Sequence, residues 1–145
     1  MNKILLLVFI MGTLYSQCQS IDGFRGWKWG TPYSEVETEL IKSRNKIPGF
    51  KAYDKIGDKL EYEGMQVRLI TYGFKKNVFK AINIGMYSKD IDAIIEVFTK
   101  KYGKPKQTEM EFLKNWEWHL ENADISVAFI PTKKENGISV GIKGK

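Results

Sequence analysis

Cysteine and histidine are almost absent from this chain, which has one of each among its 145 residues, Cys18 and His119. A disulfide needs two thiols, so no intramolecular disulfide can form, and packing must supply the stability of the fold. Zinc sites take three or four ligands from His, Cys and carboxylates, and one histidine with scattered acids does not match that pattern. We therefore predict no metal and no other cofactor.

Sequence signatures of catalysis and of nucleotide binding are also missing. No glycine-rich segment leads into Gly-Lys-Ser/Thr, and there is no Gly-x-Ser-x-Gly nucleophile motif. Asp90 and Asp92 lack the further oxygen ligands and the glycine turn of a calcium loop, and we interpret them as charges that favour the start of a helix. Because no recognition helix or aromatic RNA-binding motif is present either, the sequence predicts a protein that is not an enzyme and does not bind nucleic acid.

No hydrophobic run is long enough to cross a bilayer. The apolar segment over residues 4–15 has about a dozen residues, against the roughly twenty that a membrane-spanning helix needs. Lys3 precedes this segment and a polar stretch follows it, which is typical of a secretory signal peptide. We predict a signal peptide over residues 1–16 and an exported mature chain, periplasmic or secreted, without a transmembrane segment.

The cleavage site has two interpretations. A cut after Ser16 places a small residue before the bond, and the bond can shift as far as residue 20. Alternatively, a cut before Cys18 would let that thiol carry a lipid anchor, although such a signal favours a small residue where this chain has Gln17.

Charge of one sign does not dominate the surface. The formal net charge is +6, and removal of the leader with Lys3 lowers it by one. Basic pairs and acidic residues alternate along the chain, so we expect a mixed, solvated surface. The densest basic group, Lys100, Lys101 and Lys104, lies at the predicted end of a helix and is a candidate contact for an anionic envelope surface.

The first half of the mature chain contains one predicted helix. A short extended piece over residues 23–30 precedes Thr31 and Pro32, which suit an N-cap and a first helical position. The apolar residues that follow lie at helical spacing on one face, and they are Tyr33, Val36 and Leu40. Residues 45–49, with a proline and a glycine, end this helix.

A hairpin is predicted in the middle of the chain. Residues 50–64 are charged and irregular, and we interpret them as a loop with one edge strand near residues 60–62. Residues 65–74 and 78–86 are rich in branched and aromatic side chains, and the polar residues 75–77 between them favour a turn.

The second half contains the clearest helix, over residues 88–103. Its apolar stripe consists of Ile91, Ile94, Ile95, Phe98 and Tyr102. We expect Ser88 to cap its start and Gly103 to end it. Three strands follow, over residues 112–120, 125–130 and 138–142, each with one apolar face.

These elements predict one α+β domain over residues 21–145. Its antiparallel sheet would bury one face under two main helices, and the order of a helix followed by strands in each half suggests a tandem repeat.

Four segments carry a family resemblance. They are Phe24-Arg25-Gly26-Trp27-Lys28-Trp29-Gly30-Thr31, Tyr72-Gly73-Phe74, Lys101-Tyr102-Gly103-Lys104-Pro105 and the strand containing Trp116. This F-x-G-x-x-W-G-T, K-Y-G-x-P and W pattern resembles small exported bacterial α+β proteins of unknown function, and the leader resembles those of flavobacteria. The order of helix and strands is also similar to that of beta-lactamase-inhibitor protein and of outer-membrane assembly lipoproteins, a fold analogy that implies no function and no site residues.

The best candidate polar site is one strand face carrying Glu117 and His119, which we interpret as exposed polar residues rather than catalytic or metal-binding ones. The four tryptophans could form a platform for a sugar or a peptide, but a domain of this size needs their area in its core. We therefore predict a non-catalytic binding or interaction module of the cell envelope, whose partner is an unidentified protein or envelope component. The alternative is a small hydrolase or metal-dependent enzyme that uses Glu117 and His119.

Overall fold

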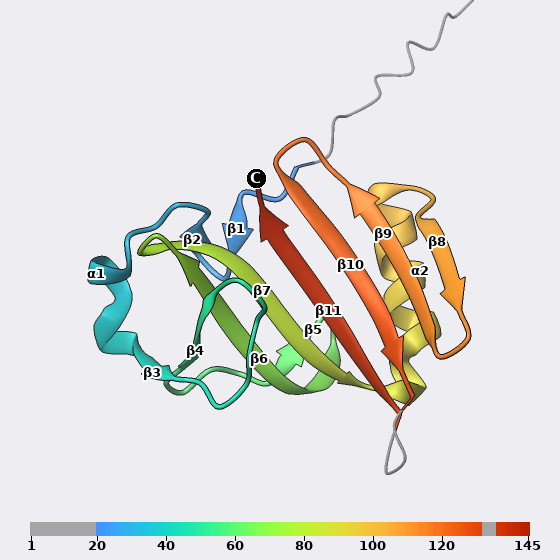
Figure 1. The fold of residues 1–145 in the computed structure, drawn as a ribbon, viewed down its shortest axis with the longest axis horizontal. Helices are drawn as coiled ribbons and strands as arrows, with labels where there is room; N and C mark the ends of the chain where they lie inside the picture. The colour runs from blue at the N-terminus through green and yellow to red at the C-terminus, as the bar shows by residue number, and fades with distance from the viewer. Residues whose placement is uncertain (1–19, 132–135) are drawn as a thin grey trace, which may run out of the picture.

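A computed structural model describes residues 20–131 and 136–145 (Figure 1). The strands are β1 (Gly23–Phe24), β2 (Trp27–Lys28), β3 (Leu40–Lys42), β4 (Lys51–Lys55), β5 (Glu61–Tyr62), β6 (Met65–Lys75), β7 (Val78–Tyr87), β8 (Lys106–Met110), β9 (Leu113–His119), β10 (Ala123–Ile130) and β11 (Gly137–Gly144). The α-helices are α1 (Tyr33–Val36) and α2 (Ile91–Tyr102), and each adjoins a 3₁₀ helix, η1 (Glu37–Glu39) and η2 (Ser88–Asp90) respectively. The predicted signal peptide and Cys18 lie outside the described residues, as does most of the loop expected between β10 and β11.

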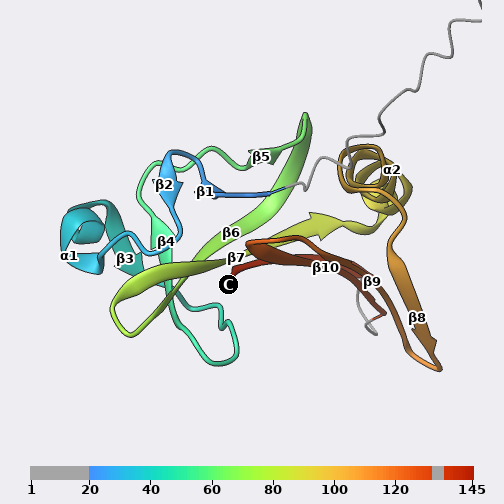
Figure 2. The ribbon, with the colours of Figure 1, turned by 90° about the horizontal axis from the view of Figure 1, so that it is seen from above.

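Nearly all of the strands belong to one antiparallel sheet of nine strands. Its order is β3-β4-β6-β7-β11-β10-β9-β8, and β5 pairs with β6 beside this path. The helix α2 lies on one face of the sheet over its β8–β9 end, and the small hairpin β1–β2 lies on the same side over β6 and β7 (Figures 1 and 2). We call the face that α2 and β1–β2 cover the inner face, and the opposite one the outer face.

The inner face holds the core. Along one cross-strand row, Trp118 pairs with Ile125, Ile125 with Ile142, and Ile142 with Ile82. All four side chains are 3% exposed or less. Because side chains alternate along a strand, this row and its neighbours give the sheet one continuous apolar face. The apolar faces predicted for the three C-terminal strands are therefore confirmed.

Helix α2 lies where the sequence predicts its clearest helix, and it packs on this face over the β8–β9 end. Ile94 and Phe98 are fully buried, and the rings of Phe98 and Trp118 meet edge to face with centroids 5.5 Å apart. Gly103 ends the helix with a positive φ of 86°, a conformation that glycine adopts without strain. The predicted cap is wrong, because Ser88 begins the 3₁₀ helix η2 and no side chain caps α2.

The first predicted helix is much shorter than expected. Only α1 and η1 are helical, and from Leu40 the chain pairs with β4 as strand β3. Val36 and Leu40 are buried as the helical spacing requires, but that spacing does not distinguish a continued helix from one turn followed by a strand. Thr31 does not cap α1, since its Oγ1 donates to the carbonyl of Lys28 at 2.8 Å.

The backbone around Thr31 is occupied by the β6–β7 hairpin. Phe79 N–H donates to the Thr31 carbonyl at 2.8 Å, and Tyr33 N–H donates to the Asn77 carbonyl at 2.8 Å. Pro32 consequently takes the N-cap position in an extended conformation rather than the first helical position. Tertiary hydrogen bonds thus set where α1 begins.

Two further strands were not predicted. Strand β4 falls in the segment that the sequence analysis interpreted as a loop, and β8 follows α2 where no strand was expected. Every residue of β8 is exposed, so it lacks the apolar alternation that marks a strand. The short strand predicted near residues 60–62 is β5, and the predicted hairpin is β6–β7, turning through Lys76 and Asn77, which both have positive φ.

The domain is α+β in composition but consists mostly of strands. A helix precedes antiparallel strands in each half, yet α1 has four residues and α2 has twelve. The tandem repeat and the packing of two main helices on one face of the sheet stay predictions. No helix in the described part of the chain has the length and apolar character needed to cross a bilayer.

Replacing Phe98 with alanine should destabilise the fold by about 3–5 kcal/mol, because a fully buried ring would leave a cavity between α2 and β9. Urea unfolding monitored by tryptophan fluorescence measures this change. Thr99→Ala is the matched control on the same helix, because Thr99 is exposed, and it should change the unfolding free energy by less than about 0.5 kcal/mol. Equal losses in both variants would mean that α2 is not packed on the sheet as described.

Candidate binding surface

The outer face of the sheet carries the polar residues that the sequence analysis singled out. In one cross-strand row, His119 pairs with Asp124, Asp124 with Lys143, and Lys143 with Ala81. In the next row, Glu117 pairs with Ser126. These positions alternate with the buried row that contains Trp118, so they point away from α2.

Glu117 and His119 lie close together, as predicted, but the nearer partner of His119 is Asp124. His119 Nδ1 lies 2.8 Å from Asp124 Oδ1, whereas His119 Nε2 lies 3.9 Å from Glu117 Oε2. Asn115 donates to Glu117 Oε1 at 3.0 Å, and Lys145 Nζ lies 3.6 Å from Asp124. The turn between β9 and β10 brings Asp124 opposite His119. This strand register is the feature from which the pair could have been predicted.

This cluster is a surface arrangement. The His119 side chain is 62% exposed, and its two acidic neighbours are 34% and 44% exposed. Across residues 20–131 and 136–145, no group of three or more His, Cys, Asp or Glu side chains is placed to hold a metal ion. Water competes with every interaction in such a cluster, so each contributes little to stability.

A second feature of the outer face is the segment between β3 and β4, which we call the basic hairpin (residues 42–53). In Figure 2 it folds to the side of the sheet opposite α2. Ser43 N–H donates to the Ala52 carbonyl, and Phe50 N–H donates to the Ile47 carbonyl, both at 3.0 Å. Gly49 has a φ of 83°, which suits the turn that it forms with the preceding proline.

The basic hairpin is anchored on the sheet through Ile47 and Phe50. Ile47 is 7% exposed, although it lies in a connecting segment. A Cβ on Gly73 would lie 3.1 Å from Ile47 Cδ1, 3.3 Å from Phe50 Cβ and 3.0 Å from Ala81 Cβ. Glycine and alanine at these positions therefore let the basic hairpin pack directly on β6 and β7.

The basic hairpin borders an open surface hollow of about 700 Å³, lined by residues 42–53. Its charged residues are Lys42, Arg44, Lys46 and Lys51, and it contains no acid. All four are exposed. Four cations without an acid in twelve residues were the sequence signal for this group, which our predictions did not include.

Two more cations join this group through Phe50. Lys75 Nζ lies 5.9 Å and Lys143 Nζ lies 5.7 Å from the centroid of the Phe50 ring, within the range of cation–π attraction. We call the six residues together the basic patch: Lys42, Arg44, Lys46, Lys51, Lys75 and Lys143. Within the part of the chain that the structure describes, none of them forms an ion pair.

The predicted basic group at the end of α2 differs in this respect. Lys100 pairs with Glu96 at 2.9 Å, and Lys101 pairs with Glu63 at 2.6 Å. These acids neutralise two of the three lysines. The end of α2 therefore offers less unpaired positive charge to an anionic partner than the basic hairpin does.

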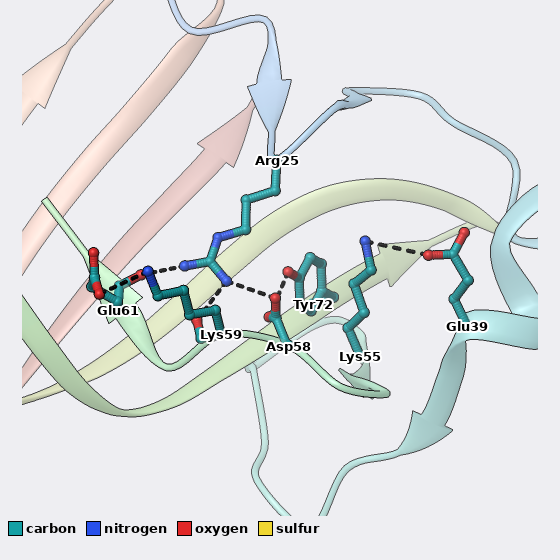
Figure 3. Close-up of polar contacts among 7 residues, drawn as sticks. All are labelled: Arg25, Glu39, Lys55, Asp58, Lys59, Glu61 and Tyr72. Atoms are coloured by element: carbon teal, nitrogen blue, oxygen red, sulfur yellow. Dashed lines mark hydrogen bonds and ion pairs between the residues drawn. The ribbon is translucent and has the colours of Figure 1, made fainter. Parts of the chain in front are cut away.

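A further polar network is centred on Asp58. Figure 3 shows Arg25 reaching from the β1–β2 turn to Asp58, which it contacts at 2.6 Å, and Tyr72 donates to the second carboxylate oxygen of Asp58 at 2.7 Å. Arg25 also donates to the carbonyls of Lys59 and Glu61. The Asp58 carboxylate is thus bonded through both oxygens, and Arg25 is committed to three acceptors, so the network joins β1–β2 to the segment after β4.

Burial, the hydrogen bond to Asp58 and the charge of Asp58 raise the pKa of Tyr72 above the ordinary tyrosine value of 10.0. Burial also raises the pKa of Tyr62, with a smaller contribution from the Glu63 charge. Both phenols favour the neutral form in the folded protein.

The tryptophans belong to the core, as the sequence analysis favoured over a ligand platform. Trp118 is 3% exposed and donates to the Gly103 carbonyl at 2.8 Å. Trp27, Trp29 and Trp116 are half-buried and pack against the core. Trp27 and Trp29 each contact Phe79, with ring centroids 5.7 Å and 5.0 Å apart.

Comparison with protein-family models, with curated proteins and with solved structures finds no match to this chain.

Stability should fall as the pH rises above about 10. The unfolded chain ionises its phenols there, whereas folded Tyr62 and Tyr72 stay neutral to a higher pH, so the folded state retains more protons and becomes relatively less stable. Below that pH the two neutral phenols make their full contribution to the free energy of unfolding. One pH unit above the unfolded pKa, each such tyrosine should remove about 1.4 kcal/mol.

The pH dependence of urea unfolding in Tyr72→Phe tests this assignment. The loss of stability between about pH 8 and pH 11 should be smaller than in the unmodified protein by roughly 1 kcal/mol, because one titrating group is gone. Tyr87→Phe removes an exposed phenol and is the control, so its loss should equal that of the unmodified protein. A Tyr72→Phe profile parallel to the unmodified one would contradict the assignment.

Proposed function

We propose that this chain is an exported, non-catalytic binding module of the cell envelope that recognises an anionic envelope component through the basic patch. The observation that carries this proposal is that the four cations of the basic hairpin, with Lys75 on β6 and Lys143 on β11 beside Phe50, form no ion pair among the described residues. Like charges repel one another, so an unneutralised group of this size is more stable with an anionic partner than without one.

The anchoring of the basic hairpin supports a binding role. A hairpin that packs on the sheet through Ile47 and Phe50 loses little conformational entropy when a partner binds. Clustered positive charge also speeds encounter with an anionic partner, and this effect weakens as salt is added.

The alternative function is a small hydrolase or metal-dependent enzyme that uses Glu117 and His119. The short contact between His119 Nδ1 and Asp124 favours it, since a carboxylate can orient an imidazole for proton transfer. Against it, the histidine is 62% exposed and thus lies in water, where such a pair gains little. We therefore rank the binding module first.

Export is the part of this proposal that rests on the leader. The charged and apolar start of the chain supports a cleaved signal peptide, with lipid attachment through Cys18 as the alternative. A mass spectrum of the protein recovered from its native host should give a chain that begins at Gln17, in the soluble fraction. A chain that begins at Cys18 with added acyl groups, in the membrane fraction, would establish the lipid-anchored form, and an intact leader would contradict export.

Binding to envelopes should depend on the basic patch and not on the end of α2. In co-sedimentation with isolated envelopes at low salt, the variant Lys42→Glu/Arg44→Glu/Lys46→Glu should remain in the supernatant, because three attractive charges become repulsive. High salt should release the unmodified protein as well.

Lys100→Glu/Lys101→Glu/Lys104→Glu is the matched control, since it makes the same change in net charge on the opposite side of the sheet. It should sediment like the unmodified protein, as should His119→Ala. If both triple variants lose envelope binding to the same extent, net charge alone explains the effect. If His119→Ala loses envelope binding, the alternative function is favoured.

A further inference from the structure

The hollow of the basic hairpin has the form of a site for a discrete ligand. Its volume of about 700 Å³ lies within the range of roughly 300–1,000 Å³ that is usual for small-molecule sites. Its wall is a single hairpin whose two arms are joined by the Ser43–Ala52 and Ile47–Phe50 backbone bonds, so the hollow exists before any ligand arrives.

The lining of the hollow combines two kinds of group. Lys42, Arg44, Lys46 and Lys51 supply positive charge, and Pro48 and Phe50 supply apolar surface between them. Phe50 is half-buried and already lies near two cations, Lys75 and Lys143. Small inorganic anions would use the charges alone and leave the apolar surface in contact with water.

A ligand that satisfies both kinds of group carries an acidic substituent on a ring with an apolar face. Sugar rings meet this description when they bear a carboxylate, because their C–H faces pack on aromatic and proline rings while the acid pairs with lysine or arginine. In a glycan that repeats such sugar units, the units next to the bound one could also contact the cations outside the hollow.

We propose that the hollow of the basic hairpin binds a carboxylated sugar unit of an acidic glycan, with Phe50 as the apolar contact and Arg44 and Lys46 as the anion contacts. This inference rests on the proposed function and names the ligand of the same patch. The cations Lys75 and Lys143 flank Phe50 and extend the site along the outer face of the sheet.

Titration calorimetry with a hexamer of galacturonic acid tests the proposal, with neutral maltohexaose and inorganic phosphate as comparison ligands. The acidic hexamer should bind with saturation at one site, and the other two should bind at least about tenfold more weakly, because each lacks one of the two required features. Equal binding of phosphate would reduce the hollow to a simple anion site and overturn the proposal, and equal binding of maltohexaose would overturn the requirement for charge.

Two variants separate the contacts from the fold. Phe50→Leu keeps an apolar side chain against Gly73 but removes the ring, and it should weaken binding of the acidic hexamer about fivefold to tenfold while its thermal midpoint changes little. Arg44→Ala/Lys46→Ala should weaken binding at least about fivefold, whereas Lys100→Ala/Lys101→Ala, which removes the same charge elsewhere, should not. Unchanged binding in both hairpin variants would overturn the site.

The outcome also separates this inference from the proposed function. If envelopes retain the protein through the basic patch but the acidic hexamer does not bind, the ligand class is wrong and the proposed function stands. If vesicles containing phosphatidylglycerol bind the protein and the hexamer does not, the partner is a lipid surface. If envelopes do not retain the protein either, both proposals fail.

Discussion

The structure depends on the burial of one face of a wide antiparallel sheet. Rows of branched and aromatic side chains run from β9 to β6, and helix α2 covers only the β8–β9 end. The hairpin β1–β2 covers the remainder, where Trp27 packs on Tyr72 and Phe79. The Arg25–Asp58–Tyr72 network holds that hairpin in place, because Arg25 joins its turn to the segment that follows β4.

Covering one face leaves the other face for polar and charged groups. On it, small residues on β6 and β7 admit Ile47 and Phe50 of the basic hairpin, and the hairpin in turn positions its cations. Acidic residues and His119 lie farther along the same face on β9 and β10. The outer face thus carries positive charge at the basic hairpin and the mixed His119 cluster on β9 and β10, an arrangement that favours ligands with a defined orientation.

Local sequence patterns correctly predicted the helix and the hairpin whose apolar periodicity and end residues are clear within a single segment. The stripe from Ile91 to Tyr102 predicted α2, Gly103 marked its end, and the polar turn at Lys76 and Asn77 predicted the β6–β7 hairpin. These patterns did not predict the strands that form only because their backbone pairs with a neighbouring strand. Leu40 satisfies a helical stripe, but its backbone pairs with β4, and β8 is a strand through its pairing with β9 alone.

The candidate site shows the same division. Sequence alone determined that Glu117 and His119 share a strand face, that the chain has too few cysteines and histidines for a disulfide or a common zinc site, and which apolar residues form the core. Only the tertiary structure decided that Asp124 is the near partner of His119, that Glu63 neutralises Lys101, and that Lys75 and Lys143 flank Phe50. The reason is physical. Alternation and helical spacing depend on neighbours along the chain, whereas the field at a charged side chain depends on every charge near it in space.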